Sequence, residues 1–246
     1  MHLDYQLLLI APLVVFCAYV MYGVSGFGSG LVNVSILANF LPLTVVVPLS
    51  LLLDFTASML VGTRFQSGVQ WRELALLAPF GLLGTITGVV LLINLPRAYT
   101  LTALGVFLVS YGLYSLTRPH KLSLISRRWA PPTALLGGAI GGLFGTGGPV
   151  FAVYLSRRLQ DKVQLKATLA SMFTFQTASR IVAYIISGLL LQKAVLLGAL
   201  ALSPLMWFGL KLGNRLHATL PRHRVLQTMA LVLVATGATL IARSQG

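Results

Sequence analysis

The stretch that decides the fold is GGLFGTGGP, which occupies residues 141–149. It lies inside an apolar segment, yet five glycines and a proline in nine residues cannot sustain a regular helix. A helix that breaks at membrane depth leaves backbone N–H and C=O groups without intrahelical partners. These groups are tolerated only where protein or a water-filled cavity satisfies them. The break therefore marks a candidate binding site.

An earlier stretch, GVSGFGSG at residues 23–30, carries the same feature. Its glycines match the later stretch at a constant offset of 119 residues: Gly23 with Gly142, Gly26 with Gly145, and Gly28 with Gly147. Further landmarks match at an offset of 125: Pro79, Gly84 and Gly88 with Pro204, Gly209 and Gly213, and Gly112 with Gly237. Matches in constant register predict an internal duplication, with residues 1–117 as the first repeat and 133–246 as the second.

The glycines of the second set leave two alternatives open. Small residues at helical spacing let helices approach closely in membranes. The contact they make could lie within one chain, or between two copies of the chain in a homodimer.

The composition is that of a membrane protein. Hydrophobic residues make up 57% of the chain and charged residues only 9%, and the mean hydropathy is +0.87. We therefore expect an all-α polytopic protein, with residues 1–246 forming a single membrane domain. The net charge of +14 does not indicate a nucleic-acid partner, because most basic residues lie in short loops between apolar segments. A single cysteine offers no thiolate cluster, and no metal or cofactor is expected.

The loop charges indicate a topology. If each glycine stretch is a hairpin that enters and leaves on one face, each half has three further crossings. Thirteen loop Lys and Arg then share one side against three, namely Arg97, Lys193 and Arg243, on the other. If each stretch were a single broken crossing, the split would be eight to eight. The hairpin arrangement fits the positive-inside rule, and it predicts a cytoplasmic basic linker at 118–132 and both termini outside.

Three crossings per half make the two repeats inverted. The first hairpin has long arms, so hydropathy would count seven or eight helices in all. Inverted repeats with broken helices are typical of secondary transporters that alternate access from one side to the other. The two glycine tips are then expected to approach each other near the midplane.

A glycine tip that opens into a helix presents unpaired N–H groups and the positive end of a helix dipole, which suit a small anion. The predicted binding residues are Ser25, Gly26, Gly28 and Ser29 at the first tip and Gly145, Thr146, Gly147 and Gly148 at the second. The alternative is that these glycines only permit close helix packing.

Two ionisable residues lie inside apolar runs and require a role. Arg180, with Gln176 one turn before it, is the candidate partner for the substrate's charge, and Asp54 is the candidate for a coupling proton. The alternative is that the two residues neutralise each other as a structural pair. The repeat register matches Asp54 with Phe173 and Arg180 with Val61, so an asymmetric function is compatible with the duplication.

An enzymatic function is not expected. Residues 23–26 read GVSG, a string of the kind found around the serine of rhomboid intramembrane proteases. No apolar run contains a histidine, and a serine without a base is a poor nucleophile. We therefore predict no catalytic residues.

GFGSGL at 26–31, GLFGTGGP at 142–149 after the basic linker, and the duplicated layout resemble the TauE/SafE family, also called the sulfite exporter or DUF81 family. The resemblance implies a small carrier of the bacterial inner membrane that exports sulfite or another sulfur-containing organic anion. Only the glycine positions carry over from the family's motif. Two alternatives stay open: an anion channel of the same fold, and a membrane partner or assembly factor that transports nothing.

Overall fold

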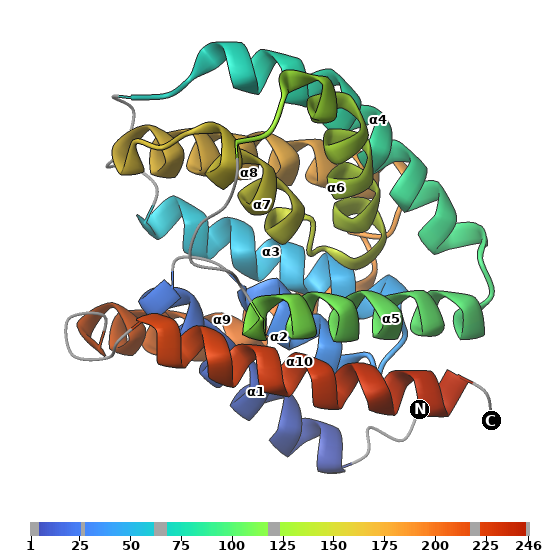
Figure 1. Ribbon diagram of the computed structural model, residues 1–246. Helices are drawn as coiled ribbons and strands as arrows, with labels where there is room; N and C mark the ends of the chain where they lie inside the picture. The colour runs from blue at the N-terminus through green and yellow to red at the C-terminus, as the bar shows by residue number, and fades with distance from the viewer. Residues whose placement is uncertain (1–4, 26–27, 62–67, 118–123, 217–221, 245–246) are drawn as a thin grey trace. The chain divides into compact units, whose positions relative to one another are not determined.

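A computed structural model describes residues 5–25, 28–61, 68–117, 124–216 and 222–244 of the protein (Figure 1). All regular structure in this part of the chain is helical, which confirms the predicted all-α class. The elements are α1 Tyr5–Ser25, α2 Ser29–Leu37, α3 Leu43–Val61, α4 Trp71–Asn94, α5 Arg97–Leu116, η2 Arg127–Trp129, α6 Ala130–Phe144, α7 Gly148–Arg158, α8 Lys162–Ile186, α9 Lys193–Leu216 and α10 Arg222–Ser244.

Both glycine stretches interrupt a helix, as predicted. Gly28 precedes α2 with a φ of 98°, and Gly145 ends α6 with a φ of 73°, a left-handed conformation that a residue with a Cβ adopts only under strain. The N–H of Gly145 donates to the carbonyl oxygen of Gly141 at 2.8 Å and closes the last turn of α6. Pro149 lies in the first turn of α7, where its missing N–H costs nothing.

The helix lengths fit a protein that crosses the membrane several times. Four stretches in the described residues are long and apolar enough to span: α4, α5, residues 163–186 of α8, and α9. Residues 10–24, 43–57 and 227–243 form shorter apolar helical stretches. The nine residues of α2 rise only about 14 Å, roughly half of a hydrocarbon core. This length suits one arm of a hairpin.

The helices form two compact units, and neither unit is a sequence half. One unit contains α1, α2, most of α3, α5, α9 and α10, and the other contains α4, η2, α6, α7 and α8. In the unit that contains α1, the helix packed along α1 is α9, which comes from the second half of the sequence. In the unit that contains α6, the helix packed along α6 is α4, which comes from the first half (Figure 1). Each hairpin is thus supported by a long helix from the opposite half.

Repeated glycines explain these two pairings. A Cβ on Gly209 of α9 would lie 2.6 Å from the carbonyl oxygen of Phe16, and a Cβ on Gly84 of α4 would lie closer still to the carbonyl oxygen of Leu135. Gly84 and Gly209 are 125 residues apart, and Phe16 and Leu135 are 119 apart, so one contact occurs twice in the predicted register. Both contacts lie within a single chain, which decides between the two alternatives for these glycines.

The core of the second unit lies where its hairpin meets α4 and α8. Its buried members are Leu77, Ala130, Ala134, Phe151, Tyr154, Leu155 and Met172. This packing fixes both arms of the hairpin and therefore the position of the tip between them.

Candidate functional site at the glycine tips

At the second tip, Arg180 of α8 binds the end of α6. Its Nη1 donates to the carbonyl oxygen of Gly145 at 2.8 Å, and its Nη2 lies 3.5 Å from Thr177 Oγ1. A helix C-terminus presents free carbonyls and the negative end of the dipole, so a guanidinium stabilises it. The structure thus brings together Arg180 and Gly145, two of the predicted site residues.

Tyr184 is a further member of this tip that the sequence interpretation missed. It lies one turn after Arg180, and its hydroxyl donates to the carbonyl oxygen of Gly142 at 2.6 Å. The sequence signal was the spacing, because a tyrosine four residues after an arginine in an apolar helix lies on the same helix face. Arg180 and Tyr184 together hold the last turn of α6 against α8.

Two predicted residues of the second tip have buried polar atoms without partners. Thr146 is 4% exposed, and its hydroxyl has no hydrogen-bond partner among the described residues. Gln176 is 6% exposed; its Oε1 accepts from Thr85 at 2.9 Å, while its Nε2 has no described partner. A buried polar group left unsatisfied costs about 1–3 kcal/mol, so two of them beside a broken helix require a reason.

The other two predicted glycines of this tip have a packing role. A Cβ on Gly147 would collide with the backbone of α6 at Gly137, and a Cβ on Gly148 would lie 3.2 Å from the ring of Phe173. Close packing is therefore sufficient to account for glycine at these two positions. Binding by their N–H groups stays a prediction.

The first tip carries a carboxylate. Tyr19 Oη and Ser29 Oγ both lie within hydrogen-bond distance of Asp54 Oδ1, at 2.7 and 2.6 Å. Ser29 is the first residue of α2, whose N-terminus favours a negative charge. The structure thus joins two predicted residues, Ser29 and Asp54, and adds Tyr19. Ser25 ends α1 but its side chain, like all of Gly26, lies outside the described residues.

Two more buried polar groups lie one turn from the residues that meet at the first tip. Asn33, four residues after Ser29 on α2, is 0% exposed, and neither its Oδ1 nor its Nδ2 has a described partner. Ser50, four residues before Asp54 on α3, is also buried with its hydroxyl unpartnered within the described part of the chain. Each therefore shares a helix face with a member of the Asp54 cluster. Asn33 was not predicted, although an asparagine in the arm of a hairpin was a visible signal.

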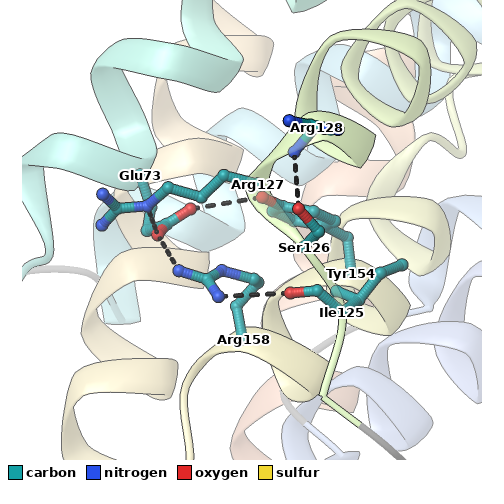
Figure 2. A network of polar contacts seen from close by, with 7 residues as sticks. All are labelled: Glu73, Ile125, Ser126, Arg127, Arg128, Tyr154 and Arg158. Carbon is teal, nitrogen blue, oxygen red and sulfur yellow. Dashed lines mark hydrogen bonds and ion pairs between the residues drawn. The ribbon is translucent and has the colours of Figure 1, made fainter.

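A third polar cluster lies at the end of α7 opposite the second tip. Figure 2 shows Glu73, the buried carboxylate of α4, between Arg127 and Arg158. Glu73 Oε1 accepts from both guanidinium groups, at 2.8 and 2.9 Å, and its Oε2 accepts from Tyr154 at 3.3 Å. Arg158 also donates to the carbonyl oxygen of Ile125 at 3.2 Å. These contacts tie the end of the basic linker to α4 and α7.

Glu73 stabilises the charged form of Arg158. The hydrogen bond from the guanidinium to this carboxylate raises the pKa of Arg158 above its ordinary value. The sequence interpretation did not include Glu73, although it is one of only four acidic residues in a chain with eighteen Lys and Arg. Such an acid has many potential partners in the basic loops. The cluster has a structural role, because it joins three elements of the second unit.

No group of three His, Cys, Asp or Glu side chains placed to hold a metal ion occurs in the part of the chain that the structure describes. At the first tip the described residues offer a carboxylate with two hydroxyl donors. The second tip offers a guanidinium, and the Thr146 hydroxyl and the Gln176 Nε2 have no partner among the described residues.

The sequence is similar to those of known membrane transporters. A protein of Comamonas testosteroni named "Probable inner membrane transporter protein TsaS" is 27% identical over 193 residues, which cover 78% of this chain and 81% of that protein. No solved structure matches the chain. The model of the family described as "Sulfite exporter TauE/SafE" matches residues 11–240, nearly the whole sequence. The chain therefore belongs to the sulfite exporter TauE/SafE family of membrane transporters.

Proposed function

We propose that the protein is a secondary transporter that exports a small sulfur-containing anion, either sulfite or an organosulfonate, across the bacterial inner membrane. The family supports transport of a sulfur anion, and the name of the Comamonas testosteroni relative supports the inner membrane. We further propose that both termini lie outside and the basic linker lies in the cytoplasm, since this arrangement places thirteen loop Lys and Arg inside.

The observation that carries the proposal is the set of donors at the second tip. Arg180 supplies a guanidinium in a nearly buried position, and Thr146 and Gln176 supply donors that no described protein atom uses. An oxyanion has several acceptor atoms and a negative charge, so it would satisfy the free donors and be attracted by the cation. Sulfite and sulfonates both present three oxygens on one sulfur atom.

The packing suggests which bodies move during alternating access. A movement of one sequence half against the other would have to separate α4 from α6 and α1 from α9, whose backbones approach closely at the glycines. Close-packed interfaces of this kind resist sliding. We therefore propose that the two contact units, and not the two sequence halves, are the moving bodies.

Asp54 is the proposed coupling residue. A carboxylate in a membrane-spanning helix that is surrounded by hydroxyl donors can exchange a proton as its exposure to water changes. The donors Tyr19 and Ser29 stabilise the ionised form when the proton leaves. Transport of the anion would then be linked to a proton gradient.

The test is flux of ³⁵S-sulfite, and of a panel of labelled sulfonates, by purified protein in proteoliposomes with and without an imposed pH gradient. We expect saturable flux that the gradient changes and that unlabelled substrate on the opposite side accelerates. Flux that depends only weakly on temperature and shows no such acceleration would favour the anion channel. An absence of flux for every anion tested, in protein shown to be folded, would overturn the transport proposal.

A further inference from the structure

The unit that contains α5 and α10 has a pocket that is not lined by residues of the glycine tips. Its volume is about 420 Å³, and its lining residues are Ala38, Asn39, Arg97, Ala98, Leu101, Leu240 and Arg243. Two of the seven are arginines, and they are 146 residues apart in the sequence. The pocket therefore brings together two of the three basic residues on the side predicted to face outward.

Close helix packing places these two arginines side by side. Gly105 of α5 and Gly237 of α10 face each other, and a Cβ on either would lie within 2.8 Å of the other's carbonyl oxygen. This approach sets Arg97 at the start of α5 beside Arg243 near the end of α10. Arg243 is also held in place, because its Nη1 donates to the carbonyl oxygen of Asn39 at 3.0 Å.

None of the described residues that line the pocket is acidic. In the described part of the chain, no carboxylate lies within ion-pair distance of Arg97 or Arg243. The contrast is with Arg158, which the 119-residue register matches with Asn39 and which binds Glu73 in the other unit. The residue matched with Glu73, at the offset of 125, is Gly198. Among the described residues, Arg158 thus has a carboxylate partner, whereas Arg97 and Arg243 have none.

A helix terminus adds to the positive potential of the pocket. α5 begins at Arg97 after Pro96, which provides no side-chain cap, and its first backbone hydrogen bond runs from Thr100 to Pro96. The N–H groups of the first turn precede that bond and need other acceptors. Two exposed arginines and the first turn of a helix therefore line one pocket, a combination that favours an oxyanion.

The size and lining of the pocket indicate what kind of anion fits. A volume of 420 Å³ is several times what a bare sulfite ion fills and lies within the range of about 300–1,000 Å³ that is usual for small-molecule sites. Leu101 and Leu240 give it an apolar wall. The complement is an organic anion with a sulfonate or phosphate group at one end and carbon atoms at the other.

The position of the pocket relates it to the first tip. α2 begins beside Asp54 at Ser29, and Asn39 lies just past its other end. The helix between them is about 14 Å long, which is close to half of a hydrocarbon core. If the tip lies near the midplane, the pocket lies at the membrane surface.

We propose that the pocket formed by Arg97, Arg243 and the first turn of α5 is a second binding site, which holds an organic oxyanion at the outer surface of the protein. The anionic group is either that of a free organosulfonate or that of an anionic phospholipid headgroup. The site is distinct from the glycine tips and its occupancy does not require transport.

The first arm of the test measures the free anion. Propane-1-sulfonate is titrated calorimetrically into detergent-purified protein and into the Arg97→Gln, Arg243→Gln and Lys193→Gln variants. Lys193 is the matched control, because it is an exposed basic residue on the same predicted side but does not line the pocket. Each arginine variant should weaken binding about tenfold, the effect of one lost charge-assisted hydrogen bond, and Lys193→Gln less than twofold. Arg97→Lys should recover part of the affinity.

The second arm measures lipid. Retention of phosphatidylglycerol is compared with that of phosphatidylcholine by native mass spectrometry in the same variants. Selective loss of phosphatidylglycerol in the two arginine variants would support the site with a lipid headgroup as its ligand. The proposal is overturned if neither ligand responds to the arginines, or if Lys193→Gln has as large an effect as they have. Thermal unfolding of each variant confirms that it is folded. Because both arms measure binding, failure of the transport proposal would leave their results interpretable.

Discussion

The two glycine tips share a backbone design but differ in chemistry. At the first tip, Ser29 forms a hydrogen bond with Asp54. The register of 119 residues matches these positions with Gly148 and Phe173, which face each other at the second tip as an apolar contact. A hydrogen-bonded carboxylate at one tip is thus replaced by an aromatic ring at the other.

The arginine, in contrast, occurs at the second tip and is not present at the matching position of the first half. Arg180 binds the end of α6 at the second tip, and the matching position in the first half is Val61. Duplication therefore gave both halves a broken helix and the same glycine contacts, while the ionisable groups differ. Under the proposed function, the second tip would bind the anion and the first would exchange the proton.

Removal of the arginine should have the largest effect on function. We expect Arg180→Gln to lower sulfite flux about 100-fold, because substrate loses a charge-assisted contact and the end of α6 loses its cation. Arg180→Lys should retain part of the flux. The measurement is flux per folded molecule in proteoliposomes, with thermal unfolding as the control. Full flux in a folded Arg180→Gln protein would show that this residue serves structure alone.

The matched glycine contacts should differ in their effect on stability. A Cβ on Gly84 meets the backbone of α6 more closely than one on Gly209 meets that of α1. We expect Gly84→Ala to destabilise the protein by about 2 kcal/mol and Gly209→Ala by about 1 kcal/mol, as is typical of overpacking. Unfolding midpoints in detergent compare the two variants. If Gly209→Ala destabilised the protein more than Gly84→Ala, the loss of stability would not follow from how closely each glycine approaches the neighbouring backbone.

Replacement of the carboxylate should remove coupling but leave the fold intact. An imposed difference of one pH unit can drive about tenfold accumulation when one proton moves per substrate. Asp54→Asn should reduce this accumulation to none, because the amide carries no exchangeable charge, while Tyr19 and Ser29 keep a partner. Accumulation is measured with and without the gradient. Gradient-dependent accumulation that persists in Asp54→Asn would assign coupling to another group.

The tyrosine at the first tip should have the smallest effect. Tyr19→Phe removes one donor to Asp54, and we expect the coupled flux to fall about threefold, the effect of a single neutral-donor hydrogen bond. The duplication matches Tyr19 with Gly138, so the matching position in the second half carries no side-chain donor. Tyr99→Phe, at an exposed ring, is the control. Equal effects of the two substitutions would argue against a specific role for Tyr19.

The sequence predicted the features that depend on local chemistry. Glycine and proline content indicated both helix breaks, and constant offsets indicated the duplication. The exchange of α4 and α9 between halves could not be predicted, because the duplication makes α1 and α6 equivalent partners for either glycine set. The sequence also marked Arg180 as an unusual charge in an apolar helix but did not identify its partner Gly145, because that contact depends on how α8 packs against α6.

Contacts between residues far apart in the sequence could not be predicted either. Tyr19 and Asp54 are 35 residues apart, and Arg97 and Arg243 are 146 residues apart. Neither pair is marked by a motif. Their contacts follow from packing between helices, which periodicity alone does not specify.

The most direct test of an anion site at the second tip is the affinity of Thr146→Val for ³⁵S-sulfite, measured by equilibrium dialysis beside its unfolding midpoint. Valine has the shape of threonine without the hydroxyl, and the Thr146 hydroxyl has no described protein partner. We predict affinity about tenfold weaker, with stability unchanged or increased, because a hydrogen bond to a charged ligand is lost and a buried unsatisfied group is removed. Unchanged affinity in the variant would contradict an anion site at this tip.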